Sequence, residues 1–523
     1  MEYNQPSLIV KDLNFGNDAK TKVILGVDKL AKAVKSTLGA SGKCVVYEDA
    51  RGKPVITKDG VTVAESVVLL DPVENMGATL IKEAAKNTVK EAGDGTTTAI
   101  VLAESLLKNV NQDENLGFST REIKDGINSG LNKINAYLDK YATPVEGKML
   151  EHVSAISCNN DEKIGKIISE AYNKVGKDGV VLMEESATEE TYSDIVKGVK
   201  IDSGLTSPHL ITDKDKNTSI LETPHVLIVS SPIPNIRKIQ KILEYIIKTK
   251  ASLLIVASVE QQVKSALLMN KVKGNIKINI VDLPGFGPTK QDTIEDLAIL
   301  TGAKVINEEL GDDLDLIEPD VLGHVIKSVT DDKCTILTLG HESENLKQRI
   351  KEVEKKIKNE KNPFLKKKIQ DRLVMLSGSV GVVNVGAASK IELKEKKDRV
   401  EDAIYATKAA LQEGIVPGGG IALLNASQNI KTENIGEKIL AEAIKSPFIT
   451  IMANAGIENY EIPTTKGIGF NVVSGNTVDM IKAGIVDPVL VTKTALKNAV
   501  SVVSTIISAD CVISNVRIDH ESS

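Results

Sequence analysis

A glycine-rich turn that opens an apolar helix constrains this chain more than any other stretch. Residues 93–98 read Gly-Asp-Gly-Thr-Thr-Thr, and the residues that follow are mostly aliphatic with helical spacing. The free N–H groups and the positive dipole end of such a helix face the turn and favour an anion. Asp94 adds a hard carboxylate, which suits a magnesium ion shared with phosphate oxygens. The stretch therefore predicts a site for a nucleotide and its metal ion.

A purely structural interpretation of the same residues stays open at this point. A Gly-Asp-Gly turn followed by a helix with threonine near its N-cap is a common local structure. Short glycine motifs also arise often by chance. The choice between a phosphate site and a plain turn depends on the rest of the chain.

Length and composition limit the classes of protein to consider. The chain has 523 residues, more than one hydrophobic core usually organises, and this length favours about three domains. Its net charge of -6 gives no reason to expect a surface for nucleic acid. There is no Trp and aromatic residues make up only 3%, so side chains on which bases could stack are scarce. We therefore expect aliphatic cores and no nucleic-acid partner.

The cysteines and the apolar tracts bear on where the protein works. Cys44, Cys158, Cys334 and Cys511 lie far apart, which argues against a zinc ribbon or a disulfide framework and favours inert core thiols in a reducing compartment. Residues 1–6 show neither an export signal nor a transit peptide. The most apolar tract, near 500–512, is too short to span a bilayer. We expect a cytoplasmic protein, bacterial or in the host cell if viral, without a membrane partner.

Periodicity divides the chain into helical and mixed regions. Helical spacing covers residues 21–38, 76–92, 99–110 and 120–141, with a predicted hairpin at 44–57. Strand patterns at 175–183 and 194–201 are followed by β-branched runs at 226–229, 253–256 and 278–281, each separated by a helical pattern. Two amphipathic helices are predicted to meet near Asn362 and Pro363, and helical spacing returns from Val400. The fold class is therefore multidomain, with α and α/β parts.

Several turns, in collinear order, resemble one protein family. They are Thr37-Leu38-Gly39, Lys58-Asp59-Gly60, the run at 93–98 and Val416-Pro417-Gly418-Gly419-Gly420, with further matches at 11–19, 74–78, 283–287, 394–403 and 484–488. Together they resemble the group I, GroEL-like chaperonins over nearly the whole chain. The resemblance implies a mainly helical equatorial ATP-binding domain (1–139 and 414–523), a small mixed intermediate hinge domain (140–196 and 381–413) and an α/β apical substrate-binding domain (197–380).

The resemblance also assigns roles around an ATP site with Mg²⁺ and, in addition, K⁺. It implies that Asp402 is the catalytic aspartate, brought over the γ-phosphate by hinge closure, with Asp59 as a second acid near the attacking water. Asp94 matches the magnesium ligand. The other nucleotide-binding positions that it implies are Thr37, Leu38, Gly39, Ala40, Lys58, Gly95, Thr96, Thr97, Thr98, Gly419, Asn471, Val472, Val473 and Asp487. Without the resemblance, Asp402 reads as a surface acid in a charged helix.

The apical match is looser. The resemblance implies contacts with unfolded polypeptides and a co-chaperonin through Leu205, Leu210, Ile239, Leu243, Val263, Leu268 and Met269. Gln240 and Lys264 stand where apolar residues are usual, and His209 and Leu210 where aromatic residues are usual. An ordinary amphipathic-helix interpretation assigns Ile239, Leu243 and Leu268 to the domain core instead.

We expect an ATP-hydrolysing chaperonin with an isomerase-type folding activity, assembled from identical subunits in rings of seven. Two features depart from the family pattern: the chain ends at Ser523 without a Gly-Gly-Met tail, and Ile449 stands where a basic residue contributes to contact between rings. The sequence therefore does not decide whether the assembly has one ring or two. A holdase without encapsulation and a single-ring assembly are the alternatives. A magnesium-dependent phosphotransferase is a further rival, although we find no additional His or Cys cluster to serve as its base.

Overall fold

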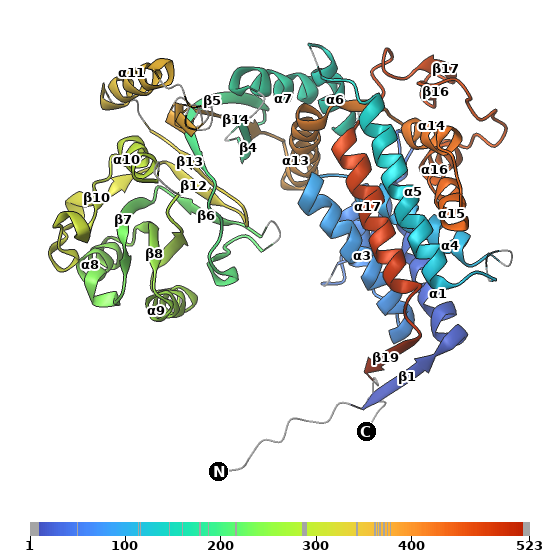
Figure 1. Cartoon of the computed structure of the whole chain (residues 1–523), viewed down its shortest axis with the longest axis horizontal. Coiled ribbons are helices and arrows are strands. Elements are labelled where there is room, and N and C mark those ends of the chain that lie inside the picture. Colours follow the sequence, from blue (N-terminus) through green and yellow to red (C-terminus); the bar gives the residue numbers. More distant parts are fainter. Residues whose placement is uncertain are drawn as a thin grey trace. The chain divides into compact units, whose positions relative to one another are not determined.

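The computed structural model describes residues 10–515 with short gaps, and the chain divides into two compact units (Figure 1). The gaps are residues 50, 113–114, 116, 146, 159–160, 177–178, 187, 215–216, 285–289, 341–343, 360–361, 363–364, 366–367, 370–371, 374 and 377. Unit 1 comprises Met1–Glu170, Met183–Tyr192 and Asn384–Ser523, and unit 2 comprises Ala171–Leu182 and Ser193–Val383. The three-domain division stays a prediction.

Unit 1 is mainly helical and is built from both ends of the chain. Its first part contains β1 (Lys11–Phe15), α1 (Gly16–Lys35), β2 (Val45–Glu48), β3 (Pro54–Thr57), α2 (Gly60–Ser66), α3 (Pro72–Ala92), α4 (Thr96–Val110), α5 (Thr120–Tyr141), α6 (Met149–Ser157) and α7 (Glu162–Val175), which runs on into unit 2. Its last part contains α13 (Lys390–Glu413), β15 (Ile415–Pro417), α14 (Ile421–Asn429), α15 (Ile435–Ala443), α16 (Ser446–Asn454), β16 (Ile468–Asn471), β17 (Asn476–Asp479), β18 (Val486–Pro488), α17 (Val489–Ile506) and β19 (Cys511–Asn515).

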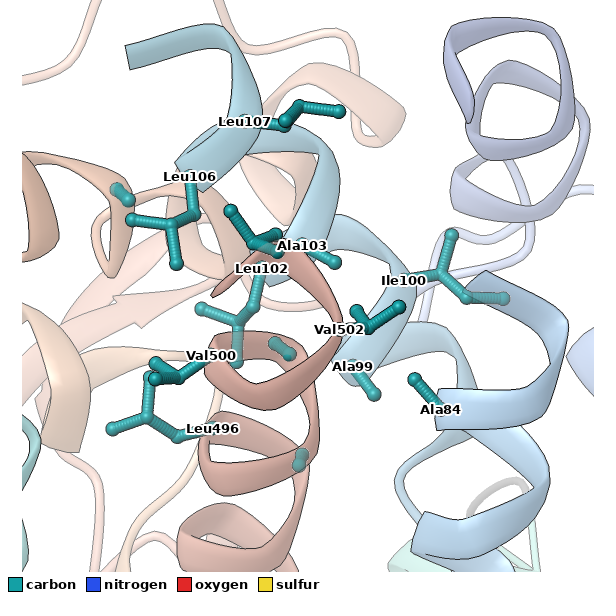
Figure 2. Close-up of a cluster of buried hydrophobic side chains, with 14 of the residues drawn as sticks. Ala84, Ala99, Ile100, Leu102, Ala103, Leu106, Leu107, Leu496, Val500 and Val502 are labelled. Carbon is teal, nitrogen blue, oxygen red and sulfur yellow. The ribbon is translucent and has the colours of Figure 1, made fainter. Parts of the chain in front are cut away.

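The helix that follows the glycine-rich turn lies in the core of unit 1. Leu102 and Leu106 of α4 are buried in one cluster with Leu496 and Val500 of α17 and with Ala84 of α3 (Figure 2). Burying each such aliphatic side chain contributes about 1.5 to 3 kcal/mol. Helix α4 is therefore a fixed support for whatever its first turn binds, and the predicted helix at 99–110 is confirmed.

The two chain ends meet in one small sheet. β1 pairs antiparallel with β19, from Lys11 opposite Asn515 to Phe15 opposite Cys511. The predicted return of the chain to its first part is thus confirmed. Among the described residues, α17 is the one helix long and apolar enough to cross a membrane by length and composition, and 56% of it is buried in the core of unit 1.

Unit 2 contains two sheets. The first has the order β10 (Val305–Ile306), β7 (His225–Ile233), β8 (Ser252–Val259), β9 (Lys277–Val281), with β11 (Gly323–His324) also on β7. The second has the order β4 (Val180–Glu185), β14 (Ser379–Val385), β5 (Tyr192–Ile201), β13 (Thr335–Thr338), β12 (Lys327–Thr330), β6 (Ser219–Glu222). β7, β8 and β9 pair in parallel, joined by α8 (Gln240–Thr249) and α9 (Gln261–Val272), which confirms the predicted α/β region.

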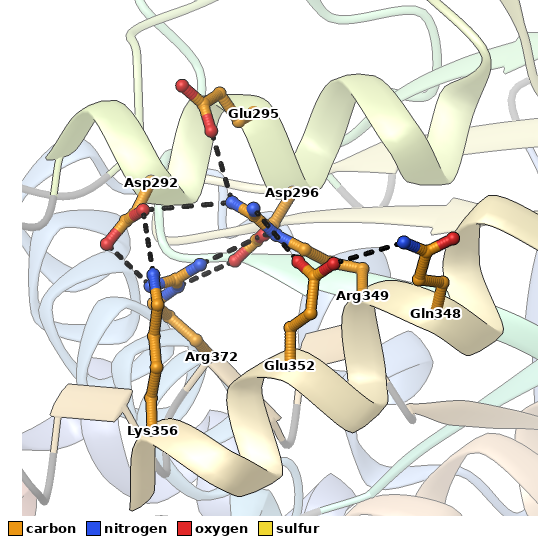
Figure 3. Close-up of polar contacts among 8 residues, drawn as sticks. All are labelled: Asp292, Glu295, Asp296, Gln348, Arg349, Glu352, Lys356 and Arg372. Carbon is orange, nitrogen blue, oxygen red and sulfur yellow. Dashed lines mark hydrogen bonds and ion pairs between the residues drawn. The ribbon is translucent and has the colours of Figure 1, made fainter. Parts of the chain in front are cut away.

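A charged cluster joins the remaining helices of unit 2. The carboxylate of Asp296, on α10 (Lys290–Thr301), is fully buried and accepts from Nε of Arg349 on α11 (Glu344–Asn359) at 2.6 Å and from Nε of Arg372 at 2.6 Å (Figure 3). Arg372 also pairs with Asp292. Arg349 pairs in addition with Glu295 at 3.1 Å, so Asp296 is the buried centre of a network in which several acids balance two arginines.

Several expectations need correction or fall outside the described residues. Helix α13 begins ten residues before Val400, and α1 ends at Lys35 rather than near Leu38. Cys44 is exposed, so it is not a core thiol. Pro363 at the predicted hinge, residues 1–6 and the chain end at Ser523 lie outside the described residues.

Candidate functional site

Two glycines in left-handed backbone shape the turn between α3 and α4. Gly93 ends α3 with φ 77° and Gly95 precedes α4 with φ 98°. A Cβ at Gly93 would collide with the side chain of Tyr405, and one at Gly95 would lie 2.9 Å from Cγ1 of Val491. Within the described part of the chain no side chain caps α4, so the N–H groups of its first turn remain available for an anion.

Asp94 lies between the two glycines, with a carboxylate that accepts from the Gly95 N–H. Burial raises the pKa of Asp94 above its usual range, and the nearby charge of Asp59 raises it further. A buried carboxylate beside another acid favours either a proton or a cation. Asp94 is therefore suited to hold a metal ion.

Asp59 is fixed at the start of α2. Its carboxylate accepts from the N–H groups of Val61 at 3.1 Å and Thr62 at 2.7 Å, and from the Thr62 hydroxyl at 2.6 Å. The next residue, Gly60, lies so close to Thr97 that a Cβ on it would collide with the Thr97 hydroxyl. The beginning of α2 thus lies against the first turn of α4.

Asp402 on α13 comes close to the same acids. Its pKa is raised well above the usual range, first by burial and then by the charges of Asp94 and Asp59. Tyr405, one turn further along α13, packs on Gly93 and places this helix against the turn. The interpretation of Asp402 as a surface acid is wrong, because residues far away in the sequence surround it.

Asp487 on β18 is the fourth acid of this cluster. It lies opposite Val416 of β15, and its carboxylate accepts from the N–H groups of Gly419 and Gly420. Burial and the charge of Asp94 raise the pKa of Asp487 to about 7. Four acids from four chain segments therefore act on one another.

The residues of this cluster fit a cation bound together with an anion. The acids raise one another's pKa values, which a cation would reverse, and the uncapped first turn of α4 offers N–H donors for an anion. In the part of the chain that the structure describes, no three His, Cys, Asp or Glu residues form a metal-binding group, so the acids alone are not a complete ligand set and oxygen atoms of the anion and of water would complete the coordination of a cation. We call Asp59, Asp94, Asp402 and Asp487 the acid cluster.

The turn after α1 is held in place from α16. Nδ2 of Asn454 donates to the carbonyls of Lys35 at 2.8 Å and Leu38 at 2.9 Å, and Gly39 has φ 84°. Thr37 is buried, and its hydroxyl donates to the carbonyl of Val34 at 2.8 Å. Ala40 is exposed. The nucleotide-binding role of this turn stays a prediction.

The remaining predicted positions lie around β15 to β17. Oδ1 of Asn471 accepts from the N–H of Val473 at 3.0 Å, and Val473 itself is 75% exposed. Val472 packs on the core that contains Met480, and a Cβ at Gly419 would lie 3.1 Å from Cε of that methionine. Lys58 is half-buried beside Asp59. Gly419 thus approaches a methionine of the core on which Val472 packs, and the roles of both residues stay predictions.

The apical positions divide by burial. Leu210, Ile239 and Val263 are 0%, 0% and 2% exposed in the core on the α8 and α9 side of the sheet. Their assignment as substrate contacts is corrected, because a buried side chain offers no surface to another polypeptide. Partly buried Leu205, Leu243 and Leu268 line the same core, and Met269 is 58% exposed.

Two positioning residues were missed by the sequence interpretation. Tyr405 packs on Gly93, and Asn454 fixes the turn at Leu38. Tyr405 stands three residues after Asp402, on the same helical face, which is a signal that the sequence offers. Asn454 offers no comparable signal, because its partners are more than four hundred residues away.

The raised pKa of Asp487 predicts a pH-dependent stability. An unfolded aspartate has a pKa near 3.9, so the folded chain binds this proton more tightly and loses stability as pH rises from about 4 to 7. Asp487→Asn should remove this loss, because the amide oxygen can still accept from Gly419 and Gly420. Relative to wild type, we expect a gain of about 1.5 kcal/mol at pH 5 that rises to about 4 kcal/mol at pH 8, at about 1.4 kcal/mol per pKa unit.

Denaturant unfolding of the ligand-free full chain at both pH values measures this difference. Glu461→Gln, at an exposed acid of the same unit, is the matched control and should change nothing. An equal offset at pH 5 and pH 8 for Asp487→Asn would contradict the prediction.

Comparison with known proteins agrees with this architecture. The chaperonin gp146 of bacteriophage EL 2 (Pseudomonas aeruginosa), crystallised in the presence of ATP-BeFx, shares 21% identity with the chain in two crystal forms. In form II the TM-score is 0.70 over 96% of this chain and 98% of that one, and in form I it is 0.63 over 97% and 99%. A sequence model of the TCP-1/cpn60 chaperonin family matches residues 30–517. The chain therefore belongs to the TCP-1/cpn60 chaperonin family.

Proposed function

We propose that this chaperonin binds Mg²⁺-ATP at the acid cluster and hydrolyses it to drive polypeptide folding. The observation that carries the proposal is the approach of Asp402 to Asp94 and Asp59, close enough to raise its pKa. The phage chaperonin of the same fold was crystallised with ATP-BeFx, which supports nucleotide binding here.

Each residue has a separate task in this proposal. Asp94 supplies a carboxylate to the metal ion, and the N–H groups of Thr96, Thr97 and Thr98 donate to phosphate oxygens. When bound, the metal ion neutralises phosphate charge. Asp402 accepts a proton from the attacking water and orients it, and Asp59 lies beside that water.

In this proposal the nucleotide is bordered by two further groups of residues. One is the turn from Thr37 to Ala40, and the other consists of Gly419, Asn471 to Val473 and Asp487. We include in the proposal a K⁺ ion bound near the phosphates. Repulsion between Asp402 and the other acids falls when a cation is bound, because their charges are then screened. Nucleotide binding thereby favours the approach of α13, and this links ATP to movement of the chain.

The folding activity is supported by family membership and by apolar surface on unit 2. Met269 is exposed on α9, and Leu243 on α8 and Leu268 on α9 are partly buried. We propose that this surface captures non-native polypeptides, and that the chain works in the cytoplasm in seven-subunit rings, single or double, with a co-chaperonin. Release of the captured chain into the ring cavity is the isomerase-type step.

A holdase that captures without encapsulation is the second candidate. Gln240 on α8 is exposed and donates to Glu244 at 2.7 Å, so part of this surface is polar. Refolding of a denatured substrate protein separates the two candidates. A yield that rises only with ATP supports the folding chaperonin, and suppression of aggregation without any ATP-dependent recovery favours the holdase.

Substitution of Asp402 tests the catalytic assignment. Asp402→Ala should lower steady-state ATP turnover at least about 100-fold, because a positioned general base contributes that much or more. Affinity for a fluorescent ATP analogue should persist. Asp398→Ala, at an exposed acid one turn earlier on α13, is the matched control and should keep most of the turnover. Unchanged turnover in Asp402→Ala, or a loss caused entirely by weaker nucleotide binding, would refute this role.

A further inference from the structure

Two of the six histidines of this chain face each other in unit 2, and neither is among the residues assigned a role above. His225 at the start of β7 is the direct cross-strand partner of His324 at the end of β11. The neighbouring ladder hydrogen bond runs from the Val325 N–H to the Pro224 carbonyl at 3.2 Å. The histidines therefore occupy a non-hydrogen-bonded position, where opposing side chains lie closest.

The separation of the two rings suits a shared metal ion. Their centroids lie 5.6 Å apart at an interplanar angle of 56°. Two imidazoles that bind one zinc ion at a tetrahedral or wider angle place their centroids about 5 to 6 Å apart, since each Zn–N bond is about 2.0 Å. Parallel stacking would need a much smaller interplanar angle, so the two rings are not stacked on each other.

One ring is already fixed in the form that a metal requires. The ring of His225 is hydrogen-bonded to the backbone of Gly323, so one nitrogen is engaged and the other is left with its lone pair. Metal-binding histidines commonly hold a backbone carbonyl in this way. Burial and the neighbouring His324 lower the pKa of His225, which keeps it neutral near pH 7.

The surroundings leave the site open to solvent on one side. His324 is exposed, and Tyr245 of α8 packs edge-on against His225 with centroids 5.7 Å apart. Among the described residues no third His, Cys, Asp or Glu joins the pair. Solvent would therefore complete the coordination shell.

We propose that His225 and His324 form a binding site for a divalent first-row transition-metal ion such as Zn²⁺. Imidazole nitrogen suits Zn²⁺ and Cu²⁺, whereas Mg²⁺ prefers the oxygen atoms of the acid cluster. β11 pairs with β7 through only two residue pairs. A bound ion would tie this short strand to β7 and, next to Tyr245, to the side of the sheet that carries α8.

Calorimetric titration of the untagged, chelator-treated full chain with Zn²⁺ alone tests the proposal, with excess Mg²⁺ present to occupy oxygen-only sites. We expect one saturable site whose affinity falls at least about tenfold in both His225→Gln and His324→Gln, since each removes one of two protein ligands. His209→Gln, at an exposed histidine of the same unit, is the control and should bind like wild type. Far-UV circular dichroism confirms that the variants fold.

Electron paramagnetic resonance with Cu²⁺ gives an independent readout on the wild-type chain. We expect the Cu²⁺ spectrum to show ligand superhyperfine splitting from two imidazole nitrogen atoms. No saturable Zn²⁺ site, a loss of affinity in only one of the two variants, or a Cu²⁺ spectrum without two nitrogen donors would overturn the proposal and leave the pair as an aromatic contact.

Discussion

Repulsion between carboxylates is the constraint on which the rest of unit 1 depends. Asp94, Asp402 and Asp487 all have raised pKa values, and in each case the charge of another acid is one of the causes. The packing of four separate segments holds these acids together against their repulsion. In the proposed function that repulsion has a use, because a cation bound with the nucleotide screens the charge of the acids and α13 then approaches more easily.

The supports of this cluster differ in rigidity. α4 is buried among α3 and α17, so its first turn, which we propose to bind phosphate, is fixed by the core. Asp59 is fixed by three hydrogen bonds at the start of α2. Asp402, in contrast, is carried on a long helix that contacts the turn through Tyr405 packed on Gly93. If the first turn of α4 binds phosphate as proposed, a rigid binding turn and a catalytic acid on a separate helix together suit a reaction that is switched by movement.

Local periodicity predicted much of the fold and little of the environment of each side chain. The helix at 99–110 and the parallel strands at 226–229, 253–256 and 278–281 follow from spacing that is encoded within each segment. The resemblance assigned Ile239 and Val263 to a substrate surface although both lie in the core, whereas the amphipathic-helix interpretation, which placed Ile239 in the core, is confirmed for that residue. The start of α13 was missed because its first residues are charged and show no apolar period. The local pattern did not predict the environment of Asp402, since Asp94 and Asp59 are more than three hundred residues away in the sequence; only the family resemblance linked these three acids.

Proton release on nucleotide binding tests the central claim most directly. Calorimetric titration of the chain with Mg²⁺ and a non-hydrolysable ATP analogue near pH 7, in buffers of different ionisation enthalpy, counts the protons exchanged. A cation within the acid cluster lowers the raised pKa values, so we predict net release of protons, reduced in Asp487→Asn. Tight binding without proton release, or the same release in that variant, would contradict binding at the acid cluster.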